Sequence, residues 1–171
     1  YNNFKESPMK VSNEIINIFP EIKKWRHELH AHPELGYEEE WTSNFVAEKL
    51  ESFGLEIHRG MGTTGVVGVL KGANASLGGG GNKAIGLRAD MDALPMTEEN
   101  DFSYKSKFDG RMHACGHDGH TAMLLGAAKL LSSKKDFDGT VYFIFQPAEE
   151  GGGGGLAMIE DGLFEQFPMD S

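Results

Sequence analysis

The sequence predicts an α/β fold in which a central mixed sheet is flanked by helices. Short apolar runs, rich in β-branched and aromatic residues, alternate with stretches of helical periodicity. Acidic side chains follow directly after two of these runs, as expected at the carboxyl ends of strands. The chain of 171 residues is 39% hydrophobic and 25% charged, which fits one compact domain.

The first third of the chain is predicted to be helical. Apolar residues recur at helical spacing over residues 12–30, where Pro20 is expected to kink the helix or to start a second one. The sequence HPELG at residues 32–36 breaks this pattern. A second amphipathic helix is expected over residues 41–53, and Gly54 is expected to stop it.

Four segments have the character of strands. One strand begins at residues 55–58. The apolar runs at residues 66–70 and 84–89 are expected to pair with each other across a glycine-rich turn at residues 78–81. Residues 140–145 are continuous in β-branched and aromatic residues, which is typical of a central strand covered on both faces.

Two further helices are expected. Residues 121–131 are apolar nearly all round and rich in small residues, which predicts a buried helix packed closely on the sheet. Asp118 is the expected N-cap of that helix. Residues 156–162 predict a short helix that ends at Gly162.

Charge and cysteine content limit the class of protein. The net charge is −10, and no basic cluster is longer than two residues, so nucleic acid is not an expected partner. The single cysteine excludes an intramolecular disulfide and is compatible with a reducing cytosol. No apolar run reaches the roughly 18 residues that span a bilayer. We therefore expect a cytoplasmic protein that does not enter the membrane.

Chemically reactive residues gather in three short segments, RADMD (88–92), MHACGHDGH (112–120) and QPAEE (146–150). Thiolate, imidazole and carboxylate groups together bind divalent transition metals, and adjacent glutamates can divide metal binding from proton transfer. The pattern predicts metal-assisted hydrolysis. The candidate side chains are Asp90, Asp92, Cys115, His117, Glu149 and Glu150.

Other interpretations of these residues stay open. Taken singly, the aspartates can be turn formers, the glutamates a solvated pair, and Cys115 a small buried hydrophobe. Cys115 and His117 can also form a thiolate–imidazole nucleophile pair, although this leaves the glutamates without a role. The glycines after Glu150 are not followed by Gly-Lys-Ser/Thr, so they do not form a phosphate-binding P-loop.

Taken together, four segments resemble the M20 metallopeptidase family, in particular its amidohydrolase branch. That branch includes hippurate hydrolases, N-acyl-L-amino-acid amidohydrolases and plant indoleacetyl-amino-acid hydrolases. The segments occur in the expected order and span most of the chain: WRHELHAHPELG (25–36), LRADMDALP (87–95), MHACGHDGHTA (112–122) and QPAEEGG (146–152). The resemblance implies a catalytic domain of the zinc-exopeptidase type.

The resemblance also implies roles for individual residues. Cys115, His117 and Glu150 would be metal ligands, and Glu149 would be the general base that activates water. Asp90 would be the catalytic aspartate, with Arg88 in the place of a histidine ligand of the wider family. The implied cofactor is a divalent metal, two ions per site, as manganese or zinc with cobalt or nickel as alternatives.

The implied substrate is a small N-acyl amino acid, hydrolysed to a carboxylic acid and a free amino acid. A dipeptidase or exopeptidase of the same fold, or a non-catalytic metal-binding module, are the alternatives. The family's further histidine ligands lie downstream, with a lid domain inserted between them. Residues 1–171 are therefore expected to be the N-terminal part of the catalytic domain of an enzyme that dimerises through its lid.

Overall fold

The computed structural model describes residues 11–73 and 83–171 of the protein. At its centre is one mixed sheet in which neighbouring strands follow the order β1-β2-β4-β3. β2 pairs antiparallel with β1 and with β4, whereas β3 pairs parallel with β4, so the predicted mixed sheet is confirmed. The strands are β1 (Glu56–Met61), β2 (Gly65–Lys71), β3 (Ala84–Asp90) and β4 (Thr140–Gln146).

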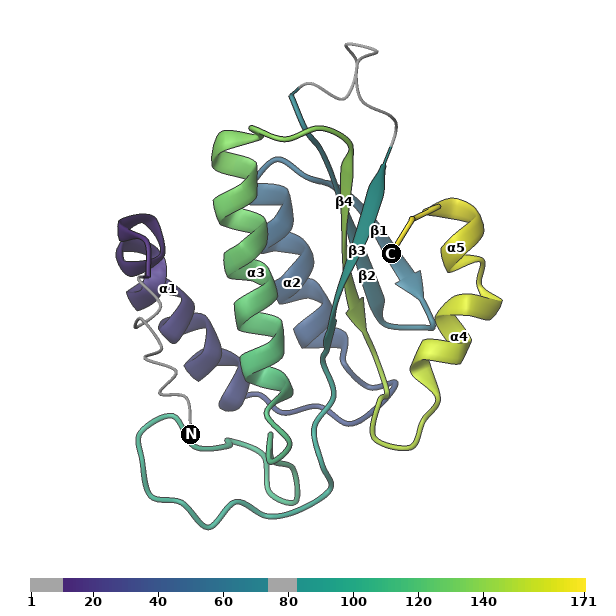
Figure 1. Ribbon diagram of the computed structural model, residues 1–171. Helices are drawn as coiled ribbons and strands as arrows, with labels where there is room; N and C mark the ends of the chain where they lie inside the picture. Colours follow the sequence, from purple (N-terminus) through teal and green to yellow (C-terminus); the bar gives the residue numbers. More distant parts are fainter. Residues whose placement is uncertain (1–10, 74–82) are drawn as a thin grey trace, which may run out of the picture.

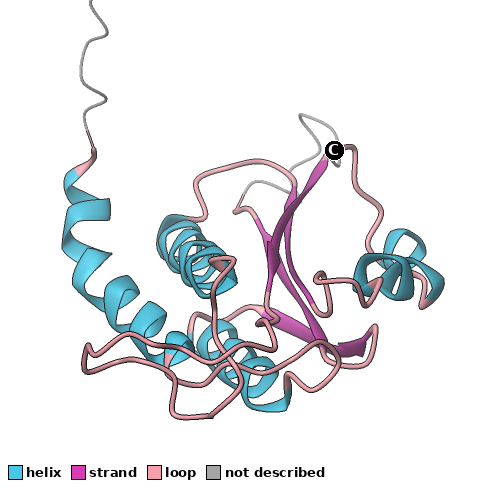
Figure 2. Ribbon diagram, turned by 90° about the horizontal axis from the view of Figure 1, so that it is seen from below, coloured by secondary structure: helices cyan, strands magenta, loops and turns pink. Residues whose placement is uncertain are grey.

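Helices cover both faces of the sheet (Figures 1 and 2). α2 and α3 pack on one face with α1 against α3, and the short helices α4 and α5 lie on the other. None of the helices in the described ranges is long and apolar enough to cross a membrane. Their bounds are α1 (Asn13–His30), α2 (Glu40–Ser52), α3 (His117–Lys134), α4 (Gly154–Glu160) and α5 (Leu163–Gln166).

The central strand β4 contributes to two hydrophobic clusters. Phe143 and Phe145 belong to the larger cluster, which the sheet forms with α1, α2 and α3. Ile144 belongs to the smaller cluster under α4 and α5, together with Met158. Successive side chains of a strand point to opposite faces, so a continuous apolar run is what a strand buried on both sides requires. The expectation for residues 140–145 is confirmed.

The predicted pairing of residues 66–70 with residues 84–89 is wrong. Both segments are strands, but β4 lies between them, so that Phe145 is the register partner of Val66 on one side and of Ala89 on the other. The most apolar strand thereby takes an inner position where both of its edges are hydrogen-bonded. The glycine-rich turn expected at residues 78–81 lies outside the described residues.

The helix ends follow the sequence signals with one exception. α1 runs through Pro20 as a single helix, and Gly54, with φ 78°, follows the end of α2. The predicted N-cap of α3 is wrong, because Gly116 occupies the cap and Asp118 lies in the first turn. The carboxylate of Asp118 instead binds His30, a residue far away in the sequence.

His30 lies in a buried polar network between α1 and α3. Its side chain is 3% exposed, and its two ring nitrogens lie 2.7 Å from Asp118 Oδ2 and 3.0 Å from Glu98 Oε1. Arg26 Nε also lies 2.8 Å from Asp118 Oδ2. An imidazole that donates from both nitrogens is protonated. The hydrogen bond to Asp118 raises the pKa of His30, against the opposing effect of burial.

This network predicts that the stability of the fold depends on pH through His30. The pKa is raised in the folded state, so the contribution is complete below the ordinary value of 6.5 and is lost as pH rises through the folded pKa. We expect His30→Leu to lower the free energy of unfolding by about 3–5 kcal/mol at pH 6, because two buried carboxylates lose a partner. The loss should be smaller at pH 9, as measured by urea denaturation.

His32→Leu is the control, because the His32 ring donates to the backbone carbonyl of Glu28 at 2.8 Å. Its loss of stability, measured at both pH values, is the reference against which the loss in His30→Leu is compared. An equal loss of stability for His30→Leu at pH 6 and pH 9 would contradict an ionised His30.

Candidate metal centre

The candidate site lies where the carboxyl ends of β3 and β4 meet the start of α3 (Figure 1). β3 ends at Asp90, and β4 is followed by Glu149 and Glu150. The two strands are parallel, so their carboxyl ends share one edge of the sheet. α3 begins there with His117. The sequence-based expectation that these segments converge is confirmed.

The three predicted ligands form one cluster. Cys115, His117 and Glu150 each offer one ligand atom, and these atoms all lie within 4.8 Å of one another. His117 is buried, whereas Cys115 and Glu150 are exposed, so the cluster is anchored on one side and open to solvent on the other. Sulfur, nitrogen and oxygen donors at this spacing are suited to a divalent transition metal.

Asp92 orients two members of this cluster. His117 Nδ1 lies 2.9 Å from the carbonyl oxygen and 3.1 Å from Oδ1 of Asp92, a residue that is 1% exposed. The other carboxylate oxygen accepts a hydrogen bond of 2.9 Å from the backbone N–H of Glu150. With Nδ1 engaged, Nε2 of His117 is the nitrogen free for a metal, which is the usual carboxylate–histidine–metal arrangement.

Asp92 also favours the protonated form of the His117 ring. The hydrogen bond to Asp92 raises the pKa of His117 to about 8, although burial acts in the opposite direction. His117 Nε2 lies 3.8 Å from Glu149 Oε2 and 4.0 Å from Glu150 Oε1. A metal would replace the Nε2 proton as the positive charge between these carboxylates.

The groups around Cys115 indicate whether its sulfur acts as a metal ligand or as a nucleophile. The hydrogen bond with Glu150 raises the pKa of the Cys115 thiol, and the charges of neighbouring carboxylates add to this effect. A nucleophilic cysteine needs a lowered pKa, so the thiolate–imidazole interpretation is disfavoured. A divalent cation supplies the compensating charge and stabilises the thiolate. The donor set therefore fits a metal.

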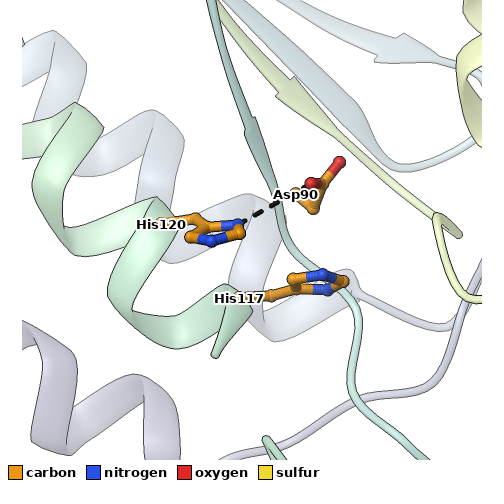
Figure 3. A group of neighbouring side chains, drawn as sticks. All are labelled: Asp90, His117 and His120. Carbon is orange, nitrogen blue, oxygen red and sulfur yellow. Dashed lines mark ion pairs between the residues drawn. The ribbon is translucent and has the colours of Figure 1, made fainter. Parts of the chain in front are cut away.

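A second cluster is formed by Asp90, His117 and His120 (Figure 3). His120 Nδ1 lies 3.7 Å from Asp90 Oδ2. The cluster shares His117 with the first, and only Nε2 of that ring is free, so the two clusters cannot each bind an ion through His117. Arg88 also pairs with the Asp90 carboxylate and opposes a cation there. The first cluster is the better metal centre.

Two other predicted residues, Glu149 and Asp90, lie beside the cluster of Cys115, His117 and Glu150. Glu149 Oε2 lies 3.8 Å from His117 Nε2, but it is Glu150 that groups with Cys115 and His117 as a possible ligand, which is compatible with a division of roles between the glutamates. Asp90 is fixed by Arg88, whose Nε donates to Gln146 Oε1 at 2.6 Å, and its catalytic role stays a prediction. The sequence analysis did not select His120, although its spacing of three residues from His117 places both on one helix face.

Comparison with known protein families matches residues 86–171 to peptidase family M20/M25/M40, and the chain belongs to this family. Hippurate hydrolase of Campylobacter jejuni is 54% identical over 162 residues, which cover 95% of this chain and 40% of that protein. N-acyl-L-amino acid amidohydrolase of Geobacillus stearothermophilus is 47% identical over 159 residues, covering 89% of this chain and 41% of that protein. The chain thus spans about two fifths of the length of these relatives.

A solved structure supports the fold assignment. The YXEP protein of Bacillus subtilis, described as a dinuclear metal-binding peptidase from the M20 family, matches with a TM-score of 0.79 and 39% identity. The match covers 87% of this chain and 41% of that chain. The expected catalytic-domain fold of this family is therefore confirmed for the described residues.

The role of Asp92 predicts the effect of removing its charge. Asp92→Asn keeps the size of the side chain but weakens the hold on His117, so we expect zinc affinity to fall by about 10–100-fold. Competition with a chromophoric chelator measures this affinity. Asp101→Asn, on an exposed loop, is the matched control and should bind zinc as the unaltered protein does. Unchanged affinity in Asp92→Asn would contradict the assigned role.

Proposed function

We propose that this chain carries the metal-binding part of an amidohydrolase that cleaves the amide bond of N-acyl amino acids. The observation that carries the proposal is the Glu149 carboxylate beside the cluster of Cys115, His117 and Glu150. A metal site with an acid–base group beside it is the arrangement that metal-assisted hydrolysis of an amide uses. The names of the two relatives, hippurate hydrolase and N-acyl-L-amino acid amidohydrolase, support this substrate class.

In the proposed mechanism the residues of the chain have separate tasks. Cys115, His117 and Glu150 hold the metal, and Asp92 keeps the His117 ring in orientation. When bound, the metal supplies a Lewis acid that polarises the scissile carbonyl and lowers the pKa of water. Glu149 accepts the proton of the attacking water and then donates it to the nitrogen of the leaving amine.

We propose two divalent ions per site, as manganese or zinc, with cobalt or nickel as alternatives. The dinuclear description of the Bacillus subtilis protein supports two ions, and the mixed sulfur, nitrogen and oxygen donors are compatible with each of these metals. Because only one ring nitrogen of His117 is free, a second ion would need ligands besides those of the first cluster.

The remaining expectations are proposals about the whole protein. The coverage of about two fifths of the relatives supports residues 1–171 as one part of a longer enzyme, and their place as the N-terminal part of the catalytic domain is retained as a prediction from the family resemblance. A homodimer formed through a lid domain and a cytoplasmic location are retained as predictions from the family resemblance and the single cysteine.

The assigned roles predict different outcomes for two substitutions in the full-length protein. We expect Glu149→Gln to lower the turnover of benzoylglycine by about 10²–10⁴-fold, because the proton acceptor is lost, with the bound metal retained. Cys115→Ser should lower the metal content as well as the activity. Glycine release measures turnover, and atomic absorption measures the metal. Glu160→Gln, on the exposed side of α4, is the control.

A panel of free dipeptides assayed beside the N-acyl amino acids separates the competing functions. Faster hydrolysis of dipeptides would favour the peptidase alternative. If the fully metal-loaded protein hydrolyses neither class, the non-catalytic alternative is favoured. Normal turnover in Glu149→Gln would exclude its role as the general base.

A further inference from the structure

The segment between α1 and α2 lies against the loop that carries the two glutamates. We infer that Glu39, the last residue of this segment, is a positioning residue that fixes the backbone turn at Ala148. By fixing this turn it places Glu149 and Glu150 in the site. The inference rests on the proposed function. The segment, residues 31–39, includes the whole HPELG sequence, to which the proposed mechanism gives no task.

Glu39 is a fully buried carboxyl group with two hydrogen bonds. Its side chain is 0% exposed. Oε1 accepts a hydrogen bond of 2.8 Å from the backbone N–H of Ala148, and Oε2 accepts one of 2.6 Å from the hydroxyl of Thr64. Glu39 is also the N-cap of α2, but its side chain makes no capping bond to the helix. The carboxyl group therefore serves the loop after β4 and not the helix.

A carboxyl group in this position is unfavourable for stability by itself. Burial raises the pKa of Glu39, and the hydrogen bonds from Thr64 and Ala148 only partly offset this effect. The ion pairs found among the described residues give it no cationic partner. A buried polar group of this kind is tolerated when it satisfies another buried polar group. Here that group is the N–H of Ala148, a residue that is itself fully buried.

The backbone at Ala148 needs such a restraint. Ala148 has φ 49°, in the left-handed region that residues with a Cβ adopt at a cost. A Cβ at Gly36 would lie 2.9 Å from the Cα of Ala148, so the segment and the loop are in close contact. The hydroxyl of Tyr37 donates to the carbonyl oxygen of Gly152 at 2.6 Å. The same segment thus holds the loop on both sides of the glutamates.

The turn at Ala148 determines the direction in which the chain enters the site. Glu39 accepts a hydrogen bond from the backbone N–H of Ala148, and Asp92 accepts one from the backbone N–H of Glu150. Glu149 lies between these two attachment points, and within residues 11–73 and 83–171 its side chain makes an ion pair with His117 but no hydrogen bond. Without Glu39 the strained turn could relax, and both glutamates would shift relative to His117.

Two variants of the full-length, metal-loaded protein test this inference. In Glu39→Gln the amide oxygen can still accept from Ala148 and the amide nitrogen can donate to the Thr64 hydroxyl, so kcat should stay within a few-fold of the unaltered protein. In Glu39→Leu the volume is kept but the acceptor is lost. We expect its kcat on benzoylglycine to fall by about 10²-fold with little change in KM, the effect of a misplaced catalytic group.

Cobalt-loaded protein gives a readout that does not depend on activity. The visible absorption bands of bound Co²⁺ report the geometry of its ligands, so Glu39→Leu should change this spectrum because Glu150 moves, whereas Glu39→Gln should not. Val46→Ala, at a buried position of the adjacent helix α2 in the hydrophobic core, is the control for a general loss of stability. It should leave both kcat and the spectrum unchanged.

The outcomes separate this inference from the proposed function. If Glu39→Leu keeps the kcat and spectrum of the unaltered protein, the positioning role is excluded. If Glu39→Gln is impaired as strongly as Glu39→Leu, the charge and not the hydrogen bond is responsible, and the inference is overturned. If the unaltered protein hydrolyses no N-acyl amino acid, the proposed function fails, but the cobalt spectra still decide the role of Glu39.

Discussion

The buried carboxylate of Asp92 is the contact on which the geometry of the site depends. Asp92 follows β3. One of its carboxylate oxygens contacts His117, the first residue of α3, and the other accepts a hydrogen bond from the backbone N–H of Glu150 in the loop after β4. Three segments that are distant in sequence thus meet at one side chain. The sheet places β3 and β4 in parallel, which brings these segments to the same edge, and Asp92 then fixes the orientation of the ligand atoms.

The start of α3 is held from a second side by the network around His30. Asp118 follows His117 directly, and its carboxylate binds His30 and Arg26 of α1. The helix therefore cannot rotate without breaking buried contacts on one side or the other. This fixed frame carries several carboxylates close to one thiol, in a chain whose net charge is already −10. A divalent cation in the cluster of Cys115, His117 and Glu150 is the compensation that this charge distribution favours.

The sequence was sufficient to predict the parts of the fold and site that depend on local patterns. Apolar periodicity located most of the strands and helices, and the strand–loop positions of the reactive residues predicted their convergence. It did not predict that β4 separates β2 from β3, because strand order depends on contacts between distant segments. The same limit explains the wrong N-cap, since Asp118 binds a residue of α1. The roles of Asp92 and Glu39 likewise depend on hydrogen bonds to backbone groups that no sequence motif reveals.

The central claim is that a divalent metal binds between Cys115, His117 and Glu150. A crystal structure of the full-length protein soaked with zinc, with diffraction data collected at the zinc absorption edge, tests this claim directly. We predict an anomalous peak at about 2.0–2.3 Å from the Cys115 sulfur, His117 Nε2 and a Glu150 carboxylate oxygen. A peak between Asp90, His117 and His120, with Cys115 free of metal, would contradict the account and assign the metal to the second cluster.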